Sequence, residues 1–286
     1  MSPLALALVL IAAVIHAGWN LLVKRVDGGP GFVWLFGVVS AVIYAPVAVG
    51  VFLVDRPRLG ATQWAFLAGS GALQVVYFLL LQRGYRVGDL SVVYPLARGT
   101  GPLLATLGAI VLFGERPGPF ALLGGGLIIV GVFALTGGVQ ILKDPSAHRG
   151  ATFGLLIGFL IGTYTLWDAH AVSTLAIPPL VLSWAQELCL VVALAPLAAR
   201  RWGTVRELWA RQRVPTLAVG VLSPLAYILV LTALRFTPVS YVAPAREMSI
   251  LIGTLMGARL LAEGQVRRRL LAAGVMLVGI VVLALA

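Results

Sequence analysis

The chain has 286 residues, of which 60% are hydrophobic and 11% are charged. A soluble domain carries about 25% charged residues, so this composition excludes an ordinary water-soluble protein and predicts an all-α membrane protein. The formal net charge of +11 is better explained by basic connectors on the cytoplasmic side of a membrane than by nucleic-acid binding. The single cysteine, Cys189, excludes an intrachain disulfide and a cysteine-based metal site.

Apolar runs long enough to cross a bilayer as a helix, about 20 residues, recur ten times along the chain. The first has neither a basic leading region nor a small-residue cleavage site, so we expect a membrane span there and not a signal peptide. Short connectors rich in glycine, proline and charge separate the runs. The predicted spans are approximately 3–23, 32–54, 63–82, 90–112, 118–137, 151–171, 178–199, 214–234, 240–262 and 270–286.

Lysine and arginine are unevenly distributed among the connectors. The connectors that follow odd-numbered spans hold 14, those that follow even-numbered spans hold 4, and three more lie inside spans. By the positive-inside rule, both termini are expected outside, on the periplasmic side of a bacterial inner (cytoplasmic) membrane. In the longest connector, 200–213, two tryptophans and a valine at helical spacing among five arginines predict a short interfacial helix.

The chain repeats itself at an offset of 148 or 149 residues. His16, Trp19 and Asn20 align with Tyr164, Trp167 and Asp168, and Arg98 aligns with Arg246. We therefore predict a first five-helix unit at 1–137, a connector at 138–150 and a second five-helix unit at 151–286. Because five is odd, the second unit enters the membrane upside down, which predicts two inverted-topology repeats of five helices (5+5).

Four motifs carry a resemblance to a known family. They are HAGWN in the first span, GDLSVVYPLARGTGP entering the fourth, FGERP after it, and SYVAPAREMSIL in the ninth. With the ten-span layout, they resemble the drug/metabolite transporter superfamily, specifically its EamA-type members. The resemblance covers the whole chain. It implies a secondary transporter, frequently an exporter of amino acids or related metabolites, whose central cavity is lined largely by spans 1, 3, 4, 6, 8 and 9.

Arg98 and Arg246 lie inside the fourth and ninth spans. A charge at that depth usually faces a wet cavity or the bundle interior, so both are candidate clamps for a substrate carboxylate or phosphate. The alternative is a structural ion pair with Glu187 or Glu247. In a continuous helix Glu247 would point about 100° away from Arg246 and could not share its face.

A stripe of aromatic and polar residues occurs in both halves. His16, Trp19 and Asn20 share one helix face in the first span, and the sixth span repeats the spacing. This pattern fits a cavity wall or, equally, an aromatic belt at the membrane interface. The full set of predicted substrate-binding residues is Arg98, Arg246, Trp19, Asn20, Trp167, Asp168, Tyr77, Tyr94, Tyr164 and His16.

Three interior carboxylates, Glu187, Glu247 and Asp168, are candidates for ion coupling. An acidic group inside a span is what a proton-coupled transporter needs. The glycines of the fifth and tenth spans, by contrast, predict close helix packing.

The sequence as a whole predicts a secondary active transporter that exports small polar metabolites, foremost amino acids, by alternating access. Organic anions, phosphate, phosphonate or sugar-type metabolites are the alternative substrates, followed by cationic drugs. An intramembrane enzyme is a distant alternative because the histidines are scattered along the chain and no nucleophile–base pair is evident. We expect no catalytic residue, metal or cofactor. The expected partners are a small-molecule substrate, the lipid bilayer, and a coupling proton or exchanged solute; the oligomeric state stays open, a monomer included.

Overall fold

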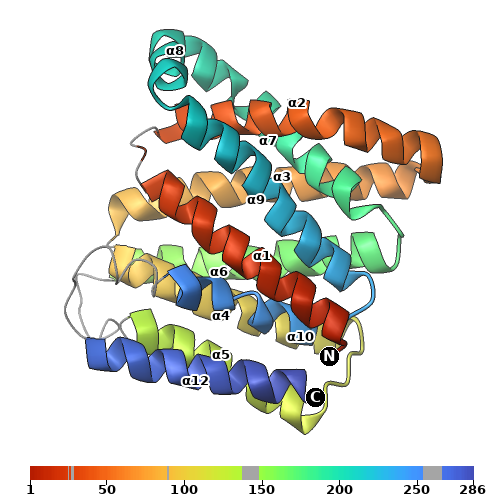
Figure 1. The fold of residues 1–286 in the computed structure, drawn as a ribbon, viewed down its shortest axis with the longest axis vertical. Coiled ribbons are helices and arrows are strands. Elements are labelled where there is room, and N and C mark those ends of the chain that lie inside the picture. The colour runs from red at the N-terminus through yellow and green to blue at the C-terminus, as the bar shows by residue number, and fades with distance from the viewer. Residues whose placement is uncertain (25, 27–28, 89, 137–147, 254–265) are drawn as a thin grey trace.

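The computed structural model describes residues 1–24, 26, 29–88, 90–136, 148–253 and 266–286. Within these residues the chain forms helices and no strand (Figure 1). The helices are α1 (Pro3–Lys24), α2 (Gly29–Asp55), α3 (Ala61–Val87), α4 (Leu90–Leu112), α5 (Pro119–Thr136), α6 (His148–Ser173), α7 (Pro179–Arg200), α8 (Trp202–Arg211), α9 (Arg213–Leu234), α10 (Val239–Ala245) and α12 (Val266–Ala284).

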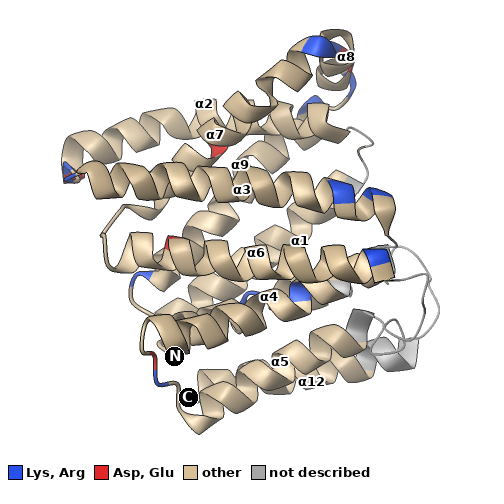
Figure 2. Ribbon diagram, turned by 180° about the vertical axis from the view of Figure 1, so that it is seen from behind, with Lys and Arg blue, Asp and Glu red and all other residues tan. Residues whose placement is uncertain are grey.

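Seven of the described helices are long and apolar enough to cross a membrane: α1, α2, α3, α4, α6, α7 and α9. Two shorter apolar helices, Pro119–Ala134 and Leu271–Ala284, accompany them. Large apolar side chains cover the outer faces; Val111, for example, is 79% exposed. Charged residues lie chiefly at helix ends and connectors (Figure 2). An apolar surface of this extent suits lipid better than water.

The helix that starts at Val239 is interrupted in the middle of a predicted span. It ends at Ala245, residues 246 and 247 form a turn, and residues 248–253 are helical again. The backbone N–H of Glu247 bonds to Pro244 O at 3.1 Å, and that of Ser249 bonds to Arg246 O at 3.2 Å, so the pairing tightens from i→i−4 to i→i−3. Pro244, which has no backbone N–H to donate, lies two residues before this turn. The sequence predicted an uninterrupted helix over 240–262; residues 254–262 lie outside the described part.

Several helix pairs correspond under exchange of the two halves. α3 packs on α6 as α1 packs on α9, and α3 packs on α7 as α9 packs on α2. Three further contacts, α2 with α7, α4 with α10 and α5 with α12, each join corresponding helices. Such an arrangement is expected of a duplicated unit. The boundaries of the two units stay a prediction.

The α5–α12 pair stands beside the other helices (Figures 1 and 2) and depends on glycine. A Cβ at Gly124 would lie 2.7 Å from Gly279 O and 2.7 Å from Leu283 N, so only glycine fits there. Close packing was therefore predicted correctly at Gly124 and Gly279. It was wrong at Gly126 and Gly274, where an added Cβ meets nothing within 4 Å.

The predicted short helix in the connector 200–213 is present as α8. Val205 is buried against α2, and Trp202 packs edge to face on Trp34 with ring centroids 6.0 Å apart. Its arginines are exposed. Its position at a membrane surface stays a prediction.

Candidate functional site

A cavity of about 470 Å³ lies between the helices and draws its walls from both halves of the chain. Its lining includes Val26 of the connector between α1 and α2, and Gly29 at the start of α2. α1, α3, α4, α6 and α9 contribute as the family resemblance implies, and so does the segment after α10. α2 and α7 also contribute. The predicted site residues that line it are His16, Trp19, Asn20, Tyr77, Tyr94, Arg98, Tyr164, Glu187 and Arg246; Trp167, Asp168 and Glu247 do not.

Two arginines of the cavity wall share one buried carboxylate. Arg98 Nε lies 2.9 Å from Glu247 Oε2, and Arg246 Nε lies 3.5 Å from Glu247 Oε1. The arginine side chains are 12% and 11% exposed, whereas that of Glu247 is fully buried. These three residues are called the arginine cluster below, and they carry one net positive charge at the cavity wall.

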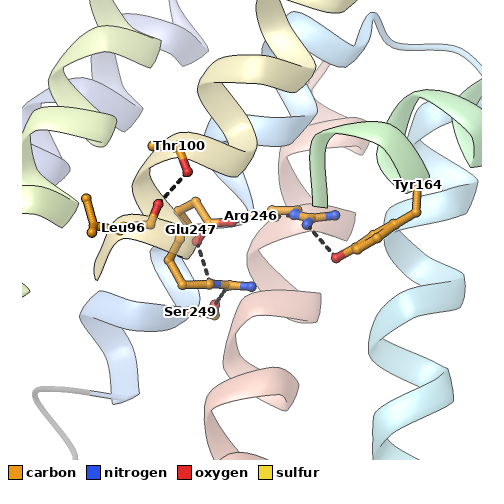
Figure 3. Close-up of polar contacts among 7 residues, drawn as sticks. Leu96, Thr100, Tyr164, Arg246, Glu247 and Ser249 are labelled. Atoms are coloured by element: carbon orange, nitrogen blue, oxygen red, sulfur yellow. Dashed lines mark hydrogen bonds and ion pairs between the residues drawn. The ribbon is translucent and has the colours of Figure 1, made fainter. Parts of the chain in front are cut away.

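Neutral hydroxyls complete the arginine cluster. Arg98 donates to Ser249 Oγ at 3.4 Å, and Arg246 donates to Tyr164 OH at 3.1 Å. Figure 3 shows Arg246 reaching Tyr164 on one side while Glu247 lies on the other. Hydroxyl groups neutralise no charge, so one positive charge of the cluster stays uncompensated. Both arginines line the cavity, and this charge is therefore available to an anionic group there.

The structure corrects the expected separation of Arg246 from Glu247. In a continuous helix their side chains would diverge, but the turn at 246–247 brings both onto one ion pair. The sequence predicted that these arginines either form a structural ion pair or face the cavity. Both arginines do both. Glu247 provides the first role, and exposure to the cavity provides the second.

Asp168 lies behind the cavity wall, at the centre of a buried polar network. Its carboxylate accepts hydrogen bonds from Ser70 Oγ, from Tyr227 OH and, at 2.9 Å, from Gln186 Nε2. Sequence reasoning missed Ser70 and Gln186 as parts of this network. Each is a polar residue inside an apolar span, which marks it as a candidate for an interior contact. Nothing in the sequence indicated that this contact is with Asp168.

The matching aromatic stripes of α1 and α6 have different surroundings. Trp19 lines the cavity and packs edge to face on His16, with ring centroids 4.8 Å apart. Trp167 instead stacks on Phe66 and donates its indole N–H to Phe66 O at 2.9 Å, which ties α6 to α3. The stripe of α1 therefore forms part of the cavity wall, whereas of the three stripe residues in α6 only Tyr164 lines the cavity.

Aromatic rings form much of the remaining wall. Tyr77 and Tyr164 meet edge to face with centroids 5.5 Å apart, and the Arg246 guanidinium lies 5.7 Å from the Tyr164 ring centroid. Tyr94 and Asn20 also line the cavity. Such a wall suits an organic solute with both apolar and charged parts.

Glu187 differs from the other two interior carboxylates. It lines the cavity, and its Oε2 atom is buried with no hydrogen-bond partner in the described part of the chain. Among the described residues, no three His, Cys, Asp or Glu side chains gather in a way that could hold a metal ion.

Comparison with known proteins gives three findings. The model of the EamA-like transporter family matches residues 3–137 and 148–285. A multidrug transporter of Pseudomonas aeruginosa is 38% identical over 113 residues, which cover 37% of this chain and 96% of that protein. One protein of known crystal structure superposes on this chain with a TM-score of 0.74, and the superposition covers 98% of both chains. The two sequences are 17% identical, so the comparison shows a shared fold.

Proposed function

The chain belongs to the EamA-like transporter family, and from this membership we propose that it is a secondary active transporter exporting small polar metabolites, foremost amino acids. Its family and its apolar helices make it an integral, multi-pass membrane protein. The proposal places it in a bacterial inner membrane with both termini outside. It also holds that the protein transports its solute and catalyses no reaction.

The proposed architecture is ten spans in two inverted repeats of five. The double match of the family model and the packing equivalence of the two halves support it. Two inverted units have two nearly equivalent packings, one open to each side of the membrane. Exchange between them would expose the central cavity alternately, which is transport by alternating access.

The observation that carries the proposal is the arginine cluster at the cavity wall. Two guanidinium groups share one carboxylate, which leaves one positive charge for a substrate carboxylate. An Arg–carboxylate pair in a dehydrated site is strong and directional. The tyrosines and Trp19 around it provide apolar surface for a side chain.

Anionic metabolites and drugs are the second candidates. Organic anions, phosphate, phosphonate or sugar-type metabolites would use the surplus cation alone. The relative named as a multidrug transporter keeps drug export open, although cavity arginines repel organic cations. For energy, we propose a proton carried by Glu187, Asp168 or Glu247, or exchange against a second solute.

Transport by purified protein in liposomes tests the proposal. We expect efflux of radiolabelled amino acids from loaded vesicles, and loss of at least about tenfold in Arg98→Gln and in Arg246→Gln. Each single change leaves one arginine paired with Glu247, so the fold keeps its charge balance while the surplus cation disappears. Arg206→Gln, on the exposed face of α8, is the matched control and should transport normally. Absence of transport for every amino acid offered, by a protein that retains its fold, would overturn the proposal.

A further inference from the structure

Of the three interior carboxylates, one has no ion-pair partner among the residues that the structure describes. Glu247 is paired with two arginines, and Asp168 accepts three hydrogen bonds. Glu187 Oε2 is buried with no hydrogen-bond partner, although the residue lines the cavity. A buried carboxylate without a partner is costly, so this atom can accept a hydrogen bond from a donor, above all a cationic one, that enters the cavity.

The position of Glu187 is held rigidly by the packing of α7 on α2. Trp184, one turn before it on α7, donates its indole N–H to Ala41 O at 2.9 Å, and Trp34 of α2 donates to Val191 O at 3.2 Å. Gly37 of α2 faces the carboxylate; a Cβ there would lie 3.6 Å from Glu187 Oε2. These two hydrogen bonds fix the backbone of α7 before and after Glu187. The helix position that carries the carboxylate is therefore preorganised for binding.

Glu187 and the arginine cluster occupy different parts of the cavity. Glu187 lies on α7, which packs chiefly on α2, α3 and α9. Among the described residues α7 has no substantial contact with α4, which carries Arg98, or with α10, which Arg246 directly follows. The cavity therefore has a positive pole at the arginine cluster and a negative pole at Glu187. Phe36 and Phe78 line the cavity with Glu187, and aromatic faces attract ammonium groups.

We propose that Glu187 binds the ammonium group of the substrate, so that the cavity selects zwitterions through two separate charged poles. This inference rests on the proposed function, which assigns the substrate carboxylate to the arginine cluster. The ammonium of an amino acid donates up to three hydrogen bonds and neutralises the unpaired carboxylate. Discrimination then has two parts: a compound without the amine leaves Glu187 unpaired, and one without the carboxylate leaves the surplus arginine unpaired.

Matched sets of compounds separate the two poles. Each set holds an amino acid, its deaminated acid and its decarboxylated amine: leucine with 4-methylpentanoate and 3-methylbutylamine, and phenylalanine with 3-phenylpropionate and 2-phenylethylamine. Affinities are measured by calorimetry on purified wild-type protein, on Glu187→Gln and on Arg98→Gln. Glu207→Gln, an exposed glutamate of α8, is the control for the chemical change, and each variant is first checked for a wild-type unfolding temperature.

The expected result is a crossed pattern. Glu187→Gln should weaken the amino acid and the amine at least about tenfold and leave the deaminated acid unchanged, while Arg98→Gln weakens the amino acid and the deaminated acid and spares the amine. Glu187→Asp, which keeps the charge, should recover part of the amine affinity. An equal loss for acid and amine in Glu187→Gln, or no loss of the amine, overturns the inference. If amines bind through Glu187 while the amino acids do not bind the wild-type protein, amino-acid export fails and the ammonium site stands.

Discussion

Glu247 is the residue on which two buried cations depend. Its carboxylate lies within 2.9 Å of Arg98 Nε and 3.5 Å of Arg246 Nε, and its side chain is fully buried. Removing one partner of a buried ion pair costs far more than the pair itself contributes, because the remaining charges stay buried without compensation.

Glu247→Gln should therefore destabilise the protein by about 3–5 kcal/mol, the strongest effect we expect from a single isosteric change. Unfolding in detergent, followed by temperature or denaturant, measures it. Glu207→Gln breaks only the exposed i,i+4 pair with Arg211 and should stay within about 0.5 kcal/mol of wild type. Similar midpoints for the two variants would contradict this account of the cluster.

The sequence predicts some residues of the site but not the contacts that they make. Arg98 and Arg246 were identifiable because a charge inside an apolar span is costly wherever it lies. The contact of Arg246 with Glu247 was not, because it depends on a local turn that redirects two adjacent side chains. Trp19 and Trp167 were indistinguishable for a related reason. They occupy equivalent positions, and only the neighbouring helix decides that one faces the cavity and the other packs on Phe66.

Among the elements, α10 is only 7 residues long, and its first turn is capped by a side chain from a distant connector. Glu115, in the connector between α4 and α5, accepts hydrogen bonds from the backbone N–H groups of Val239 at 2.7 Å and Ser240 at 3.0 Å. Those N–H groups lie in the first turn of α10, where no carbonyl of the helix can reach them and negative charge is favoured. The glutamate of the FGERP motif therefore caps α10, a structural role that could not be inferred from the motif alone.

Replacing this cap should loosen the start of α10. We expect Glu115→Ala to lower the free energy of unfolding by about 1 kcal/mol, the usual cost of a lost cap. Asp55→Ala, an exposed acid at the end of α2, is the matched control. Unfolding by denaturant measures both, and equal midpoints for the two variants would show that the contact contributes nothing to stability.

The contact between α5 and α12 provides a second test at this scale. Gly124→Val should destabilise the protein by about 1–3 kcal/mol, because its Cβ would lie 2.7 Å from the backbone of α12. Gly126→Val adds the same side chain two residues away, where a Cβ meets nothing within 4 Å, and should be nearly neutral. The comparison uses thermal unfolding of both variants. A reversed order would mean that α5 presents another face to α12.

At the scale of the whole molecule, hydropathy predicted the helical class, and repeat spacing predicted a relation between halves that the packing also has. Hydropathy did not predict the interruption at Arg246, because a broken span and a continuous one have the same average composition. The contribution of α2 and α7 to the cavity was equally out of reach. α2 and α7 are corresponding helices of the two halves, and they pack on each other. The residue pattern within a single span cannot predict such a contact.

Orientation is testable without a structure. Since positive connectors follow odd-numbered spans, a reporter active only outside the cytoplasm should be active when fused to the C-terminus, and one active only inside should be silent. The N- and C-termini lie at the same end of the stacked helices (Figures 1 and 2), so a fusion at either end should report the same side. Opposite results at the two ends would contradict an even number of crossings.

The place where the cavity reaches the connector between α1 and α2 has a kinetic consequence. This connector is one of the basic connectors that follow odd-numbered spans, so we expect an anion entering from this side to meet a positive field before it meets the arginine cluster. Attraction of this kind accelerates encounter, and added salt weakens it over a Debye length of about 8 Å at physiological ionic strength. Entry of anionic solutes from that side should therefore slow as ionic strength rises, whereas release, governed by contacts inside the cavity, should change little.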